Sequence, residues 1–378
     1  MRRIAIAIDL DWPVRHHQGV VQGVLRHARE RGWSCELDPF LGSSGSGSAR
    51  YDGVIGRVTR ALAGWVKRTR TPVVNVWINS PDQTLPRVIP DLAAAGALAA
   101  RHFLERGIRS LAFLGRAQDA AARGVLGGFR TEAARAGVDV DVHAAPADPR
   151  QAAGWHRLQR SLRRWVSGWT PPVGVFSPID LHARYLCDAC TRENLRIPED
   201  AAVLGAGNTA LLCDLMEPTL SSVEYGYERV GTHAAELLER LMAGKRPPRA
   251  PVLLPPSGIV ARRSSDMFAV EDPVASAALR SIWSRSARPV RVADVLEDVA
   301  TSRRTLERRF RRALGRSLHD EIRRSHVERS KRLLVETREP LKVVASRAGF
   351  RDAPNFSRVF RSAEGLTPQE YRERHSRP

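Results

Sequence analysis

The sequence is poor in cysteine and in aromatic residues, and it has no long apolar run. Aromatic residues make up 6% of the chain, and its four cysteines are too few to staple 378 residues with disulfides. No stretch approaches the roughly 20 apolar residues that a membrane-spanning helix needs, so we expect no membrane partner. Cys187 and Cys190 form a CxxC pair inside a helical pattern, without a second pair nearby. We therefore expect neither a metal nor a redox site there.

An export signal is also missing from the amino-terminal segment. MRRIAIAIDLDW has a basic start, but its apolar run is only about five residues before Asp9. A secretory signal needs an apolar region of about 7–15 residues. The segment therefore predicts a buried strand, and together with the few cysteines it favours a cytoplasmic protein.

Acidic residues are scarce relative to basic ones, and the imbalance is uneven. The chain has 41 Asp and Glu against 60 Lys and Arg. Residues 276–378 hold 25 basic and 13 acidic residues, a net +12, whereas the preceding 275 residues hold 35 and 28, a net +7. A basic excess gathered in one domain is typical of proteins that bind a polyanion. This distribution indicates a nucleic-acid partner for the carboxyl-terminal quarter.

The motifs of common enzyme classes are absent from the sequence. It contains no HExxH motif, no Walker loop, no Cys–His zinc set and no nucleophile elbow. We therefore expect no catalytic residue, no metal and no cofactor. Two alternatives to a DNA-binding protein without catalytic activity stay open at this point. They are a DNA-processing enzyme with a helix-turn-helix appendix and a plain carbohydrate-binding protein.

Short apolar segments alternate with amphipathic helical patterns up to about residue 260. Unbroken apolar strands between helices are typical of a parallel sheet covered on both faces. Two such series in tandem predict two doubly wound lobes with a ligand crevice between them. We expect this α/β domain at residues 1–260, a linker at 261–275 and an all-α domain at 276–378.

The carboxyl-terminal part repeats itself at an offset of fifty residues. RTLERRFRRALGRS, which begins at Arg304, aligns with PNFSRVFRSAEGLT, which begins at Pro354. The two copies share the positions of arginine, phenylalanine, alanine and glycine. The repeat predicts two helix-turn-helix motifs, at about 292–315 and 341–365.

In the first copy, Ser302 is expected to cap a helix whose buried stripe is Leu306, Phe310 and Leu314. Arg can bind guanine and Glu the cytosine amino group when a helix lies in the major groove. The outward residues predicted to bind DNA are Arg303, Arg304, Glu307, Arg308 and Arg311.

In the second copy, Gly349 is expected at the turn and Asp352 at the helix start, with Phe356 and Phe360 buried. Its predicted DNA-binding residues are Ser357, Arg358 and Arg361. This face has fewer hydrogen-bonding groups, so we expect the first copy to read bases more strongly. A long helix at 318–337 would hold the copies apart and let them enter successive major grooves.

Specific segments of the chain resemble two known families of regulators. GFRDAPNFSRVFRSAEGLTPQEYR (349–372) resembles the second helix-turn-helix signature of the AraC/XylS family, and residues 276–378 are similar to its DNA-binding domain. Residues 1–260 are similar to the effector domain of LacI/GalR regulators, with IPEDAAVLGAGN and LSSVEYGYERVGTHAAELL in the expected places. The resemblance implies a periplasmic-binding-protein-like domain, a helical DNA-binding domain and a transcription regulator.

The resemblance also implies partners and a ligand site. The partners are double-stranded DNA, a second copy of the chain, RNA polymerase, and a monosaccharide such as a pentose between the lobes. Carboxylates and amides can bind sugar hydroxyls, and an aromatic ring can stack on the sugar face. Gly207 stands where related effector domains usually have an aspartate. The residues predicted to bind the effector are Asp9, Asp11, Trp12, Asp91, Arg123, Asp180 and Asn208.

Overall fold

The computed structural model describes residues 1–10, 16–43, 50–116, 119–144, 152–267, 272–285 and 290–375. Its first lobe is a parallel sheet with the strand order β2-β1-β3-β4. The strands are β1 (Arg3–Ala7), β2 (Ser34–Leu37), β3 (Gly53–Gly56) and β4 (Val73–Asn75). The helices of this lobe are α1 (His16–Arg31), α2 (Arg60–Thr69) and α8 (Tyr227–Met242). Fully buried strands such as β3 explain the unbroken apolar runs of the sequence.

The second lobe is a larger sheet with the order β12-β10-β9-β8-β6-β7, in which β12 alone runs antiparallel to its neighbour. Its strands are β6 (Ser110–Gly115), β7 (Val140–Ala144), β8 (Val173–Phe176), β9 (Ala201–Ala206), β10 (Ser221–Glu224) and β12 (Gly258–Val260). Its helices are α3 (Leu92–Leu104), α4 (Ala120–Arg135), α5 (Ala152–Val166), α6 (Asp180–Arg192) and α7 (Ala210–Asp214). This is the doubly wound arrangement that the sequence predicts.

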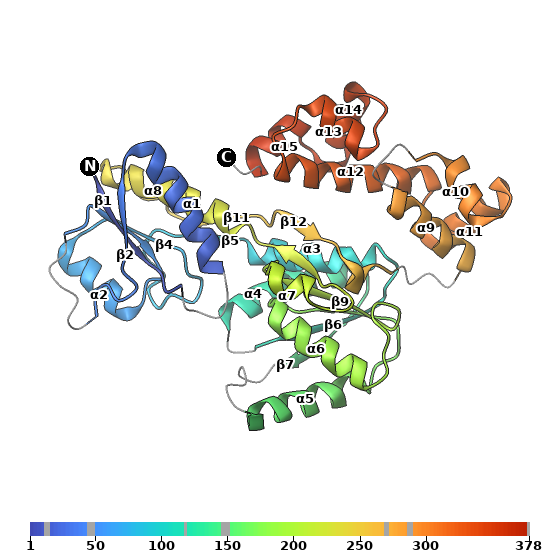
Figure 1. Ribbon diagram of the computed structural model, residues 1–378, viewed down its shortest axis with the longest axis horizontal. Helices are drawn as coiled ribbons and strands as arrows, with labels where there is room; N and C mark the ends of the chain where they lie inside the picture. The colour runs from blue at the N-terminus through green and yellow to red at the C-terminus, as the bar shows by residue number, and fades with distance from the viewer. Residues whose placement is uncertain are drawn as a thin grey trace.

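The chain crosses between the lobes repeatedly, so neither lobe is one continuous segment (Figure 1). A small parallel sheet of β5 (Val88–Pro90) and β11 (Val252–Leu254) lies at the crossing. The chain enters the second lobe after β5, returns from β10 into α8, and leaves again after β11. All of these connections between the lobes therefore pass beside the β5–β11 pair.

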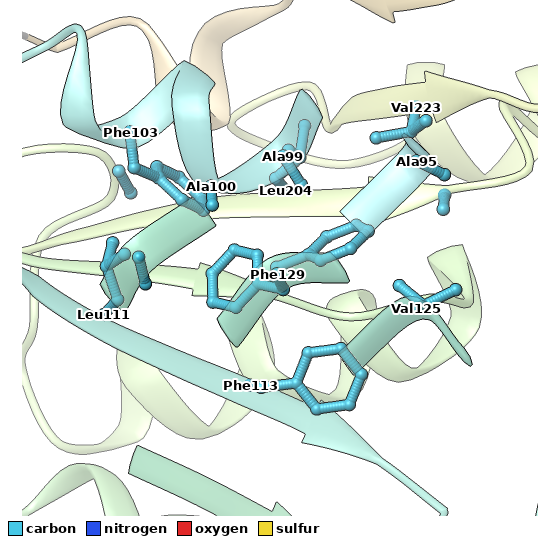
Figure 2. Packing of buried hydrophobic residues seen from close by; sticks show 14 of the residues in the cluster. Ala95, Ala99, Ala100, Phe103, Leu111, Phe113, Val125, Phe129, Leu204 and Val223 are labelled. Atoms are coloured by element: carbon cyan, nitrogen blue, oxygen red, sulfur yellow. The ribbon is translucent and has the colours of Figure 1, made fainter. Parts of the chain in front are cut away.

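Four phenylalanines form the centre of the second lobe (Figure 2). The Phe129 ring lies 6.5 Å from the Phe103 ring, 6.1 Å from Phe113 and 5.6 Å from Phe176, measured between centroids. Phe103 lies on α3 and Phe129 on α4, while the other two lie on the sheet. The cluster therefore fixes α3 and α4 to the same face of the sheet, at edge-on and tilted geometries that aromatic pairs prefer.

The carboxyl-terminal part is entirely helical over its described residues. It contains α9 (Pro273–Arg285), α10 (Val292–Val299), α11 (Arg303–Leu314), α12 (Leu318–Glu336), α13 (Leu341–Ala348), α14 (Ala353–Glu364) and α15 (Pro368–His375). One apolar core gathers α9, α10, α11 and the start of α12, and a separate core gathers the end of α12 with α13, α14 and α15. The long helix α12 connects the two halves, as predicted for 318–337 (Figure 1).

Part of the segment predicted as a linker is packed rather than exposed. A short 3₁₀ turn, η1 (Arg263–Ser265), lies against the second lobe, and Ser264 and Ser265 are buried. The Ser264 hydroxyl donates to the Val203 backbone oxygen at 2.7 Å. The fold class is confirmed, while the boundaries at 260 and 276 stay a prediction.

Candidate nucleic-acid interface and ligand site

The first helix-turn-helix copy has the caps and the buried stripe that its sequence predicts. The Ser302 hydroxyl accepts a hydrogen bond from the Thr305 backbone nitrogen at 3.3 Å and starts α11. Leu306 and Phe310 are fully buried, and Leu314 is partly buried beside them. Gly315 ends the helix with φ of 69°, a left-handed conformation that favours glycine.

The second copy repeats this construction. Asp352 caps α14 by accepting from the Asn355 backbone nitrogen at 2.7 Å, and Gly365 ends it with φ of 72°. Phe356 and Phe360 are fully buried. The burial pattern of residues 310–320 is the same, position by position, as that of residues 360–370. The repeat in sequence is therefore a repeat in structure.

The residues predicted to bind DNA lie on the solvent side of α11 and α14. Arg304, Arg308 and Arg311 are exposed on α11, and Arg358 and Arg361 are exposed on α14, whereas Ser357 is half-buried. Arg303 and Glu307 are also exposed and form an ion pair of 2.9 Å along the helix. Arg358 donates to the Asn355 side-chain oxygen at 3.2 Å. The α11 face thus offers more guanidinium groups than the α14 face.

Polar side chains from both lobes meet where their parallel strands end. Asn79, which follows β4, donates through Nδ2 to Asp119 Oδ1 at 2.9 Å. Asp119 caps α4 in the other lobe, so this hydrogen bond joins the lobes. On the first lobe, the Arg57 guanidinium lies 4.4 Å from the centre of the Trp77 ring. Burial lowers the pKa of Arg57, although Asp9 opposes this effect.

Asp180 and Asn208 belong to one hydrogen-bond network at the end of the second sheet. Asp180 accepts from the Ser222 hydroxyl at 2.6 Å and from the Thr209 backbone nitrogen at 2.8 Å. Its side chain is buried, which raises the pKa of this carboxyl. The Asn208 backbone nitrogen donates to the Ser222 hydroxyl at 2.9 Å, and its Nδ2 donates to Glu224 at 3.0 Å. Asp180 therefore fixes the turn that carries Asn208.

A polar cavity of about 240 Å³ lies beside Asn208, between α1 of the first lobe and the strand ends of the second. Gln18 and Gln22 line it from α1, and Asn208 and Glu224 line it from the other side. Amide and carboxylate groups converge there, as hydroxyl-rich ligands require. Glu224 and the two glutamines were not predicted from the sequence, because isolated polar residues in helices and at strand ends give no pattern.

Asp9, Asp91 and Arg123, which are also predicted to bind the effector, are not among the residues that line this cavity. Asp9 is half-buried at the end of β1, and its backbone oxygen accepts from His17 Nδ1 at 2.6 Å. Asp91 caps α3 by accepting from the Ala94 backbone nitrogen at 2.9 Å. Arg123 is exposed in the first turn of α4, next to Asp119. Contact of these residues with a ligand stays a prediction. Asp11 and Trp12 lie outside the described residues.

Two further properties bear on the class of protein. Among the described residues, no group of three or more His, Cys, Asp or Glu side chains is placed to hold a metal ion. No helix in the same ranges has the length and apolar character that crossing a membrane requires.

Two segments of the chain match known protein families. Residues 100–265 match a periplasmic binding protein-like domain, and residues 295–374 match a helix-turn-helix domain. The xylose operon regulatory protein of Haemophilus influenzae is 32% identical over 221 residues, which cover 58% of this chain and 57% of that protein. Its Escherichia coli K12 counterpart is 31% identical over 222 residues, with 59% and 57% covered. The match thus spans little more than half the length of these curated relatives.

Solved structures extend the likeness over the whole chain. The structure of a xylose-binding transcription activator matches with a TM-score of 0.61 and 25% identity, covering 100% of this chain and 99% of that one. A transcriptional regulator in complex with cellobiose shares the α/β fold, with a TM-score of 0.57, 22% identity and 69% of this chain covered. The chain therefore joins a periplasmic binding protein-like domain to a helix-turn-helix domain, and it resembles the xylose operon regulators in sequence and a xylose-binding transcription activator in structure.

Proposed function

We propose that this protein is a transcription regulator that binds a specific DNA sequence under the control of a small sugar held between its lobes. The observation that carries the proposal is the pair of capped helices, α11 and α14, which present exposed arginines from two repeated and separately packed halves. A helix of this kind enters the major groove with its outward face. The proposal includes a cytoplasmic homodimer and contact with RNA polymerase.

The sugar is proposed to bind at the junction of the lobes. The polar cavity beside Asn208 and the Asn79–Asp119 hydrogen bond both lie where the lobes meet. A sugar that binds one arrangement of the lobes more tightly than another would shift their equilibrium. The names of the xylose operon relatives make a pentose, D-xylose first, the ligand to test.

A thermal-shift screen of pentoses and hexoses tests this assignment. A ligand that binds only the native state raises apparent stability by about 2.7 kcal/mol at a hundredfold excess over its Kd. D-xylose or another pentose is expected to raise the Tm of the full chain. No shift with any of these sugars would contradict a sugar effector.

Asn208→Ala is expected to remove the sugar-induced rise in Tm, because the side-chain amide lines the cavity. Operator binding without sugar should persist. Asn194→Ala is the matched control: both asparagines adopt left-handed backbone conformations, with φ of 47° and 59°, but Asn194 is exposed and does not line the cavity. Equal sugar responses of the two variants would remove Asn208 from the site.

Arg308→Ala is expected to weaken operator binding by roughly 10- to 100-fold and to relax the preference at one base position. Its guanidinium lies on the exposed face of α11, opposite the buried Phe310. The preference is measured by titrating DNA duplexes that differ at single positions. An equal loss of affinity for every duplex would assign Arg308 to phosphate contacts instead.

A further inference from the structure

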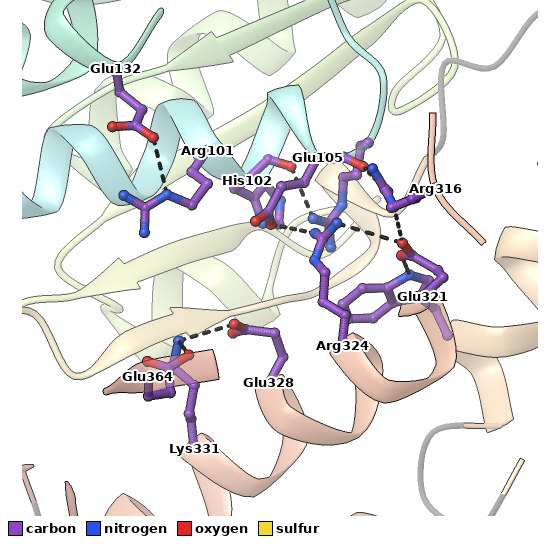
Figure 3. Close-up of polar contacts among 12 residues, drawn as sticks. Arg101, His102, Glu105, Glu132, Arg316, Glu321, Arg324, Glu328, Lys331 and Glu364 are labelled. Carbon is purple, nitrogen blue, oxygen red and sulfur yellow. Dashed lines mark hydrogen bonds and ion pairs between the residues drawn. The ribbon is translucent and has the colours of Figure 1, made fainter. Parts of the chain in front are cut away.

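The helical part rests against the second lobe at the end of α3, through charged and aromatic side chains (Figure 3). Arg324 of α12 forms an ion pair of 2.5 Å with the Glu105 carboxylate. Arg316, which precedes α12, donates to the Glu105 backbone oxygen at 3.1 Å. Glu105 directly follows α3 and therefore receives two arginines of the other domain, one through its side chain and one through its backbone.

One indole ring lies close to guanidinium groups of both domains. The ring of Trp283 on α9 has the Arg106 guanidinium of the second lobe 5.5 Å from its centre and that of Arg324 at 5.8 Å. Trp283 Nε1 donates at 2.9 Å to Glu321, whose fully buried carboxylate also accepts from Arg316 at 2.5 Å. Because every group has an oppositely charged or aromatic partner, the contact favours one defined placement of the two domains.

Arg316, Arg324 and Trp283, the groups of the helical domain at this contact, belong to the first helix-turn-helix half. Trp283 packs in the same apolar core as Leu306 and Phe310 of α11. Arg316 follows the end of α11 by two residues. A displacement of Glu105 would therefore displace α11, the helix predicted to set most of the base preference.

The same region of the second lobe is connected to the junction of the lobes. α3 and α4 touch through their backbones, because a Cβ on Gly96 would clash with the Val125 backbone oxygen and one on Gly128 with that of Ala93. The two helices must therefore move together. Asp119, which caps the start of α4, accepts the hydrogen bond from the first lobe. A shift of one lobe against the other is thus passed through α4 and α3 to Glu105.

The interface beside Glu105 is not closed by apolar packing. A cavity of about 870 Å³ lies there, lined by α3, by the segment after β12 and by α9 and α12. Intrachain interfaces of this polar kind commonly allow the domains to move relative to each other. The contact is therefore suited to be made in one state of the protein and changed in another.

We infer that the ion pair between Glu105 and Arg324 couples the sugar site to the DNA-binding domain by holding α11 in a position set by the lobes. The inference rests on the proposed function and adds to it the residues through which the regulation acts. Coupling of this kind is reciprocal, so bound DNA changes the affinity for the sugar by the same factor.

Operator affinity of the full chain, measured by fluorescence anisotropy with and without saturating D-xylose, tests the coupling. Wild type is expected to show a ratio of roughly 5- to 150-fold between the two conditions. Glu105→Gln should bring the ratio close to one and leave the Kd for D-xylose without DNA unchanged. Glu132→Gln is the control, since its ion pair with Arg101 lies within the second lobe. A wild-type ratio in Glu105→Gln would overturn the inference.

A double-mutant cycle tests whether the coupling depends on the ion pair between Glu105 and Arg324 itself. The variant that combines Glu105→Gln with Arg324→Gln should lose no more coupling than either single variant, whereas losses that add would place the coupling elsewhere.

If D-xylose does not change the operator affinity of wild type, scanning calorimetry without sugar tests whether the contact holds the two domains together. The combined variant should then unfold its helical domain in a separate, earlier transition. A single transition that is the same in this variant and in wild type would contradict the contact's role. Absence of specific DNA binding by the wild-type chain would contradict the proposed function instead.

Discussion

Phe310→Ala is expected to destabilise the first helix-turn-helix half by about 3–5 kcal/mol and to abolish the preference for the operator over random DNA. Phe310 is fully buried in the core that α11 shares with α9, α10 and the start of α12. Truncating it removes the apolar contacts that fix α11 and leaves a cavity behind. Urea unfolding monitored by circular dichroism gives the stability, and competition titrations give the preference.

Phe360→Ala is the matched control in the other half. It occupies the position equivalent to Phe310, fifty residues later, and it is also fully buried, but in the separate core of α13, α14 and α15. We expect Phe360→Ala to lose about as much stability as Phe310→Ala and to bind all DNA more weakly. It should still retain part of the preference for the operator. If Phe360→Ala abolished the preference and Phe310→Ala kept it, the proposed division of labour between the copies would be reversed.

Operator affinity is expected to fall steeply between 50 and 200 mM salt, by up to about a thousandfold, the limit that applies if all six arginines predicted to bind DNA neutralise phosphates. Each neutralised phosphate lowers the slope of log affinity against log salt by about 0.9. Five of these arginines, Arg304, Arg308, Arg311, Arg358 and Arg361, are exposed without a carboxylate partner among the ion pairs described, while Arg303 pairs with Glu307. Anisotropy titrations at a series of salt concentrations give the slope.

The contribution of α14 can be separated from this total. Replacing Arg358 and Arg361 together by alanine should make the slope shallower by about two and change the base preference little. A slope near zero for the unmodified chain would contradict the electrostatic account, whatever the variants do.

The sequence predicted the elements that local pattern determines. Strands such as β3 and β8 are buried on both faces, so their residues read as apolar runs. Ser302 and Asp352 cap helices because their short side chains satisfy the first free backbone nitrogens. The fifty-residue repeat predicted both halves of the helical domain, because each copy needs the same buried apolar stripe.

Elements that depend on distant partners gave no such signal. The edge strands β2 and β7 are only partly buried, and β5 and β11 are short strands that exist because they pair with each other. The Asn79–Asp119 and Glu105–Arg324 contacts likewise join residues that lie far apart in the sequence. Asp91, in contrast, gave a sequence signal with two possible meanings. An acidic residue at a strand end can cap a helix, as Asp91 does, as well as bind a ligand.

The most direct test of the account is a titration of the full chain on an operator selected from a random DNA library and on a scrambled duplex, with and without D-xylose. The account predicts tighter binding to the selected operator by a factor on the order of a thousand or more at physiological salt, and a sugar-dependent change in that binding alone. Equal affinity for the two duplexes, or an operator affinity unaffected by every sugar that binds the protein, would contradict it.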